Sequence, residues 1–365
     1  MNIITTGNDL CKILISDEYE ELSNILYEII DRDKKYDKAV IITDEVVDKN
    51  LYKDLSNNIF DKVDKDKFIK ICIKSGENFK NIDTYNEIIE KLINYEVSRN
   101  SLIIAFGGGV IGDIAGFVAS TYMRSLDYIQ VPTTILSQVD SSIGGKNGLD
   151  VGIYKNMIGT IKQPLFTYIN INTLKTLPKE EINSGFGEVI KYSAIMDDDG
   201  LFADFLYKNA EDIKKIENKK IIETILKCAK FKSGIVKADE KDLGLRKILN
   251  FGHTFGHAIE REYGLKHGES VAYGMKISFD IALRKNYINK NYYNKFLKLL
   301  EVYDFHFELK KINIERVIEV MKKDKKNSFN EISIILPDAD SCVGIFKMKA
   351  EMLEKAMKSC DFTKI

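Results

Sequence analysis

Hydrophobic residues in the first half of the chain form short runs that alternate with amphipathic, mostly polar stretches. The runs Ala39–Thr43 and Phe68–Ile73 are rich in β-branched residues and end at Asp44 and at a Ser-Gly-Glu turn. Residues 84–97 carry apolar side chains at helical spacing, and Leu102–Phe106 form a third run that ends in three glycines. This alternation predicts βαβ units and a parallel sheet, with functional residues at the carboxyl ends of its strands.

The pattern changes near Pro178. Beyond it the β-branched runs become rare and long amphipathic helical patterns dominate, for example Ile213–Lys237. Near the end of the chain, Ile332–Leu336 is the one segment that reads as a strand. We therefore predict an α/β N-terminal domain with a Rossmann-like parallel sheet over residues 1–178, followed by a mainly α-helical C-terminal domain over 179–365.

Length and composition agree with two soluble globular domains. The 365 residues exceed the usual size of one core, and 44% of them are hydrophobic. The 54 basic and 55 acidic residues nearly cancel, which argues against nucleic acid or a membrane surface as partner. The five scattered cysteines form no CxxC pair, and we find no leader sequence or long apolar span, so we expect a cytoplasmic protein with free thiols.

Three of the four histidines lie between positions 253 and 267. His253 and His257 are four residues apart and share one face of a helix. His267 follows an expected helix end at Gly264 and could return to the same point from a second helix. The cluster suggests a metal site, although hydrogen-bonded core or surface histidines remain an alternative at this stage.

The glycine-rich stretch 107–113 follows a strand and opens an expected helix over Ile114–Ser120. Its spacing matches the dinucleotide-binding fingerprint, in which glycines allow the backbone to approach a pyrophosphate at a helix N-terminus. The structural alternative is a tight strand-to-helix turn. Asp44, at the end of an earlier strand, is placed to accept hydrogen bonds from a ribose, or to cap a helix. Together these features favour nucleotide binding.

Cationic residues gather in the next stretch, which is rich in glycine, serine and threonine. Arg124, Lys146 and Lys155 fall within it, and this pattern favours an anionic small-molecule ligand over three unrelated surface cations. Further along, Glu188 and Lys191 are three residues apart and share a helix face. With His253 and His267, Glu188 would complete a two-histidine, one-carboxylate set of the kind that leaves metal positions open for substrate.

Long motifs in a fixed order resemble the 3-dehydroquinate synthase family of the shikimate pathway. They are GGGVIGDIAGFVAS with TYMR, VPTTILSQVDSSIGGKNGLD, a GxxKN element, SGFGEVIKY, and NFGHTFGHAIE with HGESVAYGM. The resemblance runs from about Thr43 to Met275 and is extended by the DKK element at Asp324–Lys326; beyond about residue 328 it is weak.

The resemblance implies a phosphate-eliminating lyase that converts 3-deoxy-D-arabino-heptulosonate 7-phosphate (DAHP) to 3-dehydroquinate, with NAD, one divalent metal (Zn or Co) and a homodimeric state. The metal ligands it implies are Glu188, His253 and His267. The substrate and catalytic residues it implies are Arg124, Asp140, Lys146, Asn156, Lys191, Lys232, Arg246, Asn250 and His257. The NAD contacts it implies are Asp44, Glu77, Lys80, Gly109, Val110, Asp113, Thr133, Thr134, Lys155, Thr176 and Leu177.

Three positions depart from the family pattern. Asp242 stands where glutamate is usual, Gly187 where alanine is usual, and Asn170 where aspartate is usual. Two enzyme alternatives stay open: another sugar-phosphate cyclase, and a metal-dependent polyol or glycerol dehydrogenase. The cations at Arg124, Lys232 and Arg246 favour a substrate with a carboxylate, which neutral sugar phosphates lack. An inactive anion-binding scaffold is disfavoured because the implied metal ligands and cations are all present.

Overall fold

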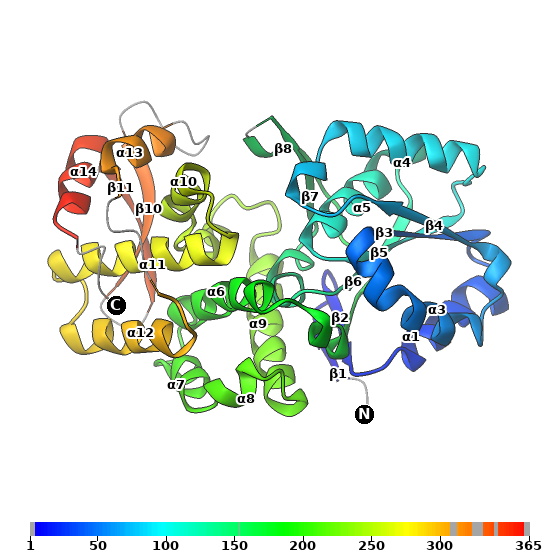
Figure 1. The fold of residues 1–365 in the computed structure, drawn as a ribbon, viewed down its shortest axis with the longest axis horizontal. Helices are drawn as coiled ribbons and strands as arrows, with labels where there is room; N and C mark the ends of the chain where they lie inside the picture. The colour runs from blue at the N-terminus through cyan, green and yellow to red at the C-terminus, as the bar shows by residue number, and fades with distance from the viewer. Residues whose placement is uncertain (1–3, 153, 307–311, 323–330, 339–341, 361–365) are drawn as a thin grey trace. The chain divides into compact units, whose positions relative to one another are not determined.

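The computed structural model describes residues 4–152, 154–306, 312–322, 331–338 and 342–360 (Figure 1). The chain divides into two compact units. Unit 1 comprises Met1–Pro178 and Ile221–Lys241, and unit 2 comprises Lys179–Lys220 and Asp242–Ile365. The segment 221–241, which we expected in the C-terminal domain, therefore packs in unit 1.

Two contacts explain why that segment joins unit 1. It forms most of helix α9 (Asn218–Ala238). The buried Lys232 of this helix pairs with the Asp140 carboxylate and donates to the Asp140 carbonyl at 2.8 Å. One residue further on, the Ser233 carbonyl accepts a 2.7 Å hydrogen bond from the Asn8 amide. These interactions connect positions about 90 and 225 residues apart, which no local pattern in the sequence reveals.

Unit 1 is built on a seven-stranded sheet in the order β1-β2-β9-β6-β5-β3-β4. Its strands are β1 (Ile4–Gly7), β2 (Lys12–Ser16), β3 (Lys38–Asp44), β4 (Phe68–Ile73), β5 (Ser101–Gly107), β6 (Asp127–Pro132) and β9 (Thr167–Asn170). Every adjacent pair is parallel except β1 and β2. The predicted parallel α/β sheet is confirmed, and its three predicted strands are β3, β4 and β5.

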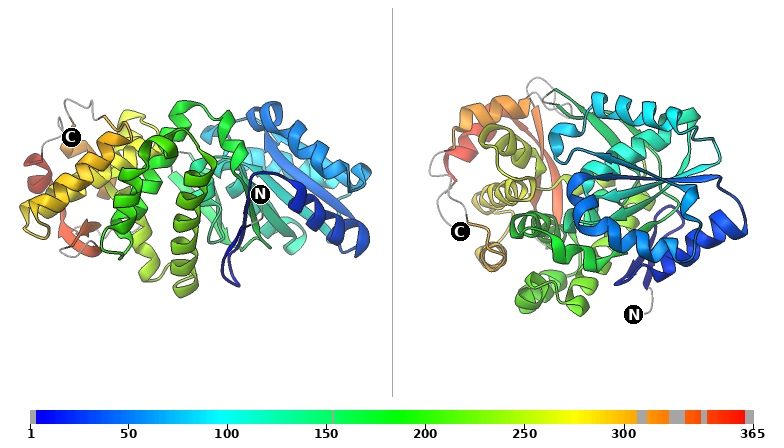
Figure 2. Two further views of the ribbon diagram at one scale, coloured as in Figure 1. Left: turned by 90° about the horizontal axis from the view of Figure 1, so that it is seen from below. Right: turned by 45° about the vertical axis from the view of Figure 1, so that its right-hand side comes forward.

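Helices cover both faces of this sheet (Figure 2). Strand β3 shows why, since Ile41 packs in one core cluster and Val40 and Ile42 in the other. The first cluster contains residues of α1 (Glu20–Leu26) and α3 (Lys53–Phe60), and the second contains residues of α4 (Ile82–Asn94) and α5 (Gly109–Thr121). A strand buried on both faces reads as a continuous apolar run, which is the pattern found in the sequence.

A separate hairpin, β7 (Lys146–Val151) and β8 (Tyr154–Ile161), was not predicted. Its sequence is rich in glycine and polar residues and lacks the alternation typical of a strand. The hairpin packs through β7 against α5, where Gly116 leaves room for the buried Asn147 side chain. Part of the stretch rich in small residues therefore forms a hairpin of unit 1.

Unit 2 is mainly helical, and its centre is α11 (His267–Arg284), most of which is buried. Figure 1 shows α11 between α10 (His253–Tyr263) and α12 (Lys290–Val302). Further helices in the described part of this unit include α6 (Lys179–Ile195), α7 (Leu201–Lys208), α8 (Ala210–Lys214), α13 (Ile314–Lys322) and α14 (Ala350–Lys358). The predicted mainly helical character of the second half is confirmed.

The structure corrects three predicted elements of the second half. The helical pattern over 213–237 is broken, because Ile216 adopts a φ of +57° between α8 and α9. Helix α6 begins at Lys179, six residues before Gly185, where the SGFGEVIKY motif predicts the start of a helix. The predicted strand is β10 (Glu331–Pro337), but it pairs with a second strand, β11 (Val343–Lys349), which we missed. The DKK element at 324–326 lies outside the described residues.

Within the described residues, no helix combines the length and the apolarity needed to cross a membrane. The longest helix, α9, carries lysines on its exposed side and buries its apolar side within the protein.

We expect Gly116→Ala to destabilise unit 1. An added Cβ would lie 1.9 Å from Oδ1 of Asn147, whose amide is held by hydrogen bonds to the Gly145 and Lys162 carbonyls. Overpacking of this kind costs roughly 1–3 kcal/mol. The measurement is the midpoint of thermal unfolding. Gly234→Ala is the matched control, because an added Cβ there meets nothing within 4 Å inside α9. Equal midpoints for the two variants would contradict the packing argument.

Candidate metal and dinucleotide sites

Glu188, His253 and His267 converge inside unit 2. Oε1 of Glu188 lies 3.3 Å from Nε2 of His253 and 3.3 Å from Nε2 of His267. Glu188 is fully buried in α6, while the two histidines are the first residues of α10 and α11. The spacing predicts that His267 returns to His253 from a second helix, and the structure confirms this.

Close contact between α6 and α11 makes this convergence possible. A Cβ on Gly187 would lie 2.4 Å from the Gly268 carbonyl oxygen, and one on Gly268 would lie 1.8 Å from the Ser184 carbonyl oxygen. The Gly268 N–H also donates to the Ser184 hydroxyl at 3.0 Å. These glycines adjoin Glu188 and His267, so the backbones approach where the two side chains must meet. Gly187, a departure from the family pattern, belongs to this contact.

A second set of contacts orients the two imidazoles. Nδ1 of His253 lies 3.1 Å from the Phe251 carbonyl oxygen, and Nδ1 of His267 lies 3.1 Å from Oε2 of Glu260. A partner on Nδ1 fixes the ring and directs Nε2 toward Glu188, as is common for histidines that ligate metals. Sequence analysis missed Glu260. Its position three residues after His257 on the same helix is the signal that could have found it.

The electrostatics of this cluster favour an ionised carboxylate. Burial by itself raises the pKa of Glu188, but the Lys191 ammonium and the two histidines more than reverse this and hold it well below its usual range. For His267, burial lowers the pKa, but the hydrogen bonds to Glu188 and Glu260 outweigh burial and raise the pKa to about 9. The carboxylates therefore favour positive charge at this point of unit 2.

The donor set fits a divalent cation. The ligand atoms of Glu188, His253 and His267 all lie within 4.8 Å of one another. The Lys191 ammonium and the Nε2 atoms of both histidines lie against the two Glu188 oxygens. One carboxylate and two imidazoles are a usual set for zinc-like ions. His257, with its ring centroid 5.2 Å from that of His253, stands beside the cluster.

In unit 1, the structure brings four of the predicted NAD contacts together. The buried Lys80 Nζ lies 2.7 Å from Asp113 Oδ2 and 3.8 Å from Glu77 Oε1, and Lys155 Nζ lies 3.6 Å from the same Glu77 oxygen. Burial lowers the pKa of Lys80, but Asp113, Glu77 and Asp150 together raise it above its usual value. Lys80 is therefore a buried, charged ammonium.

The glycine turn forms a second part of the predicted NAD site. Gly109 begins α5, and the Thr133 N–H donates to the Gly107 carbonyl at 3.0 Å. A Cβ on Gly108 would lie 3.2 Å from the Thr134 methyl group, so the two threonines border the turn. Val110 follows in the first turn of the helix. The glycines thus allow the tight packing that was the structural alternative for this turn. They also lie at a helix N-terminus, where a phosphate could bind.

The remaining predicted NAD contacts have local roles. Oδ1 of Asp44 accepts from the Val46 and Val47 N–H groups and caps the short helix α2 (Glu45–Val47), which was the structural alternative for this residue. The Thr176 hydroxyl donates to the Thr173 carbonyl just after β9, and Leu177 follows it. The contacts described for Asp44, Thr176 and Leu177 do not include the residues around Lys80. Contact of these three residues with NAD stays a prediction.

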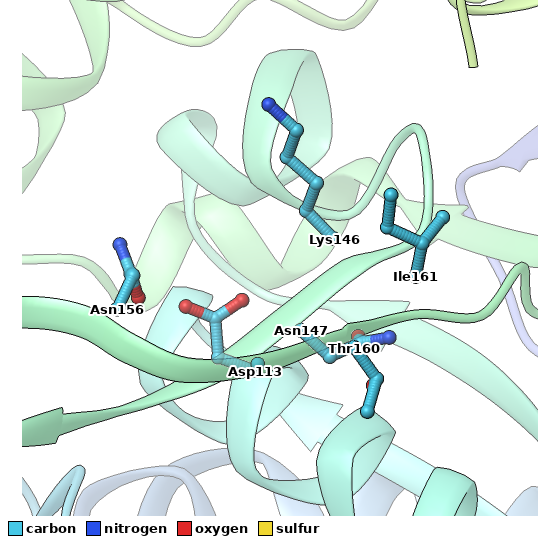
Figure 3. Close-up of a pocket in the computed structure, with 7 residues that line it drawn as sticks. Asp113, Lys146, Asn147, Asn156, Thr160 and Ile161 are labelled. Carbon is cyan, nitrogen blue, oxygen red and sulfur yellow. The ribbon is translucent and has the colours of Figure 1, made fainter. Parts of the chain in front are cut away.

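The predicted substrate residues of unit 1 fall into three places. Lys146 and Asn156 of the hairpin line a cavity of about 320 Å³ together with Asp113 (Figure 3). Asp140 and Lys232 form the ion pair that joins α9 to this unit. Arg124 is exposed, in a run of three residues with positive φ.

The predicted substrate residues of unit 2 lie on α6, in the turn before α10 and on α10. Lys191 is buried and pairs with Glu188, and its ammonium lies 4.9 Å from the centre of the Tyr192 ring. Arg246 is buried in the turn Leu245–Asn250 that precedes α10, and Asn250 ends that turn with its amide donating to the Lys247 carbonyl.

The other two departures keep defined structural positions. Asn170 caps the turn after β9 by accepting from the Asn172 N–H, a role that needs no charge. Asp242 adopts a φ of +58° at the point where the chain re-enters unit 2.

Two family models match the chain across both units. The model described as 3-dehydroquinate synthase N-terminal matches residues 70–184, and the one described as 3-dehydroquinate synthase C-terminal matches residues 185–327. The chain belongs to the 3-dehydroquinate synthase family. A 3-dehydroquinate synthase of Alkaliphilus metalliredigens is 41% identical over 304 residues, which are 82% of this chain and 84% of that protein. One of Ruminiclostridium cellulolyticum is 38% identical over 89% of each chain.

Solved structures share the fold of this 3-dehydroquinate synthase family member. A 2-deoxy-scyllo-inosose synthase complexed with carbaglucose-6-phosphate, NAD+ and Co2+ has a TM-score of 0.83 at 22% identity, over 98% of this chain and 99% of that one. A 2-epi-5-epi-valiolone synthase from Streptomyces hygroscopicus, with NAD+ and Zn2+ bound, has a TM-score of 0.83 at 19% identity over the same shares. At these identities the likeness shows the fold, and family membership shows a lyase-type enzyme.

We expect Gly268→Ala to weaken binding of Zn2+ to the metal-free protein by about tenfold or more, because the added Cβ would push α11, and His267 with it, away from α6. Isothermal titration with Zn2+ measures the affinity, and far-ultraviolet circular dichroism checks that the helices are retained. Gly234→Ala again serves as the control, since it adds the same methyl group where nothing lies within 4 Å. Wild-type affinity in a folded Gly268→Ala protein would contradict this account.

Proposed function

We propose that this chain is a 3-dehydroquinate synthase that converts DAHP to 3-dehydroquinate and phosphate, using NAD and one divalent cation, Zn or Co. The observation that carries the proposal is the convergence of Glu188, His253 and His267 in a chain of this family. The cyclase neighbours bind NAD+ with Co2+ or Zn2+, which supports the same cofactors here.

Glu188, His253 and His267 would hold the cation. A bound divalent ion supplies Lewis-acid stabilisation of oxygen atoms that gain negative charge. Three protein ligands leave coordination positions for substrate hydroxyls. Lys191 pairs with the same carboxylate, so its ammonium competes with a cation for Glu188. Once displaced from Glu188, that charge would be available to an anionic substrate group.

Lys80, Asp113, Glu77 and Lys155, with the N-terminus of α5, would hold NAD. The dinucleotide supplies a hydride acceptor that is restored within each turnover. The N-terminal turn of α5 suits a pyrophosphate, because its first N–H groups lack intrahelical partners. The carboxylates near Lys80 keep that ammonium charged and in one place, which preorganises the site.

The substrate would be a small phosphorylated sugar acid. Arg124, Lys146, Lys232 and Arg246 supply cations for its phosphate and carboxylate groups, and an arginine can bind either group bidentately. His257, beside the metal cluster, is the candidate to donate or accept a proton. The homodimer and the cytoplasmic location stay predictions; light scattering of the purified protein measures the first.

The decisive experiment incubates purified protein with DAHP, catalytic NAD and Zn2+ or Co2+, and measures phosphate release. We expect turnover with no net NADH at 340 nm, the absorbance of the reduced nicotinamide. Glucose 6-phosphate and sedoheptulose 7-phosphate, which lack the carboxylate, should be poor substrates. If either turns over efficiently while DAHP is inert, the chain is a different cyclase. Stoichiometric NADH from glycerol would instead make it a dehydrogenase.

A measurement of bound metal distinguishes the roles of His253 and His257. We expect His253→Ala to lose most of its bound metal and its turnover, because it removes one of three ligands. His257→Ala is the matched control: it should keep the metal, lose rate, and leave the fold intact. Elemental analysis measures the metal, and circular dichroism checks the fold. Full metal occupancy in His253→Ala would overturn the ligand assignment.

A further inference from the structure

Asp150 lies opposite a break in the ladder of the β7–β8 hairpin. The register shifts between Leu149 and Val151, so that three residues of β8, 155–157, lie opposite the single residue Asp150. A bulge of this kind removes backbone groups from strand pairing and redirects the side chains that it carries. Two of the predicted ligand contacts, Lys155 and Asn156, are on this bulge.

The Asp150 carboxylate satisfies one of the backbone groups that the bulge removes from the ladder. Its Oδ1 accepts a hydrogen bond from the Asn156 N–H at 2.7 Å. Asn156 adopts a φ of +53°, in the left-handed region that asparagine enters more readily than most residues other than glycine. The hydrogen bond to the carboxylate stabilises the backbone in this conformation.

The same carboxylate also faces the buried lysine of the predicted NAD site. Oδ1 of Asp150 lies 3.8 Å from Lys80 Nζ, and the Asp150 N–H donates to the Lys80 carbonyl at 2.8 Å. Lys80 in turn contacts Asp113, which lines the cavity with Lys146 and Asn156. One side chain thus connects the bulge to the residue that anchors the predicted dinucleotide site.

We propose that Asp150 is a positioning residue that holds Asn156 and the bulge in place relative to Lys80. The inference rests on the proposed function, which gives Lys80 to NAD and Asn156 to the substrate. Without the hydrogen bond from Asn156, the bulge would lose a contact that fixes its position beside the cavity. The loss should weaken substrate binding more than it slows the chemical step.

Two substitutions separate the hydrogen bond from the charge. Asp150→Asn keeps an oxygen that can accept from the Asn156 N–H but has no charge near Lys80. Asp150→Ala removes both. Glu87→Ala is the control, since it also removes a carboxylate that pairs with a lysine, at 2.6 Å on the exposed face of α4.

With the NAD- and zinc-loaded enzyme, we expect Asp150→Ala to raise KM for DAHP about tenfold, with a smaller change in kcat, which corresponds to one lost hydrogen bond to a charged group. Asp150→Asn should restore KM to within about twofold of the wild type, by the same hydrogen-bond argument. Glu87→Ala should leave both constants unchanged. A purely structural role would lower the unfolding midpoint without this split between KM and kcat.

Amide hydrogen exchange at Asn156, measured without substrate, tests the contact itself. Exchange should be faster in Asp150→Ala than in the wild type or Asp150→Asn. This measurement stands even if DAHP proves not to be the substrate, so failure of the proposed function and failure of this inference are distinguishable. Wild-type exchange and KM in Asp150→Ala would overturn it, and so would an asparagine variant as impaired as the alanine variant.

Discussion

The compensation of one buried charge organises unit 2. Glu188 is fully buried, and a carboxylate taken out of water without partners carries a large free-energy cost. Lys191 from the same helix and the imidazoles of His253 and His267 from two other helices surround it. Each of these helices must therefore present its functional residue at one point. The glycine contacts of α6 with α11 are what let the backbones come that close.

Unit 1 places the opposite charge in a comparable setting. The Lys80 ammonium is buried, and Asp113, Glu77 and Asp150 lie within 4 Å of it. These carboxylates come from the segment after β4, from α5 and from the hairpin, so a single lysine connects three segments of the chain. In both units, a buried charge has one partner three residues away and others from distant positions, and predicted ligand contacts lie around it. Removing one partner from such a group leaves the other charge uncompensated.

The balance between cofactor binding and internal packing is visible at the glycine turn. Gly107 and Gly112 would each bring a Cβ within 3 Å of neighbouring side chains, so packing alone requires glycine there. The turn therefore fits the dinucleotide fingerprint for two reasons, only one of which concerns a ligand. Asp44 is similar, since its carboxylate already caps a helix. Such motifs are stronger evidence for a ligand-binding site when, as here, several of them occur in a fixed order.

What the sequence determined by itself was the local and periodic part of this protein. Strands β3 and β5 were predicted because residues buried on both faces form apolar runs, and the edge strand β4 was predicted because its run is rich in β-branched residues. The histidine cluster was predicted because four-residue spacing fixes a helix face. The ordered motifs identified the family. The tertiary structure alone decided that α9 packs with unit 1, that a glycine-rich stretch forms the β7–β8 hairpin, and that the Asp150 carboxylate lies between the Asn156 N–H and Lys80. Each of these depends on contacts between positions far apart in the chain or on a close approach of two backbones, and neither leaves a periodic pattern in the amino-acid sequence.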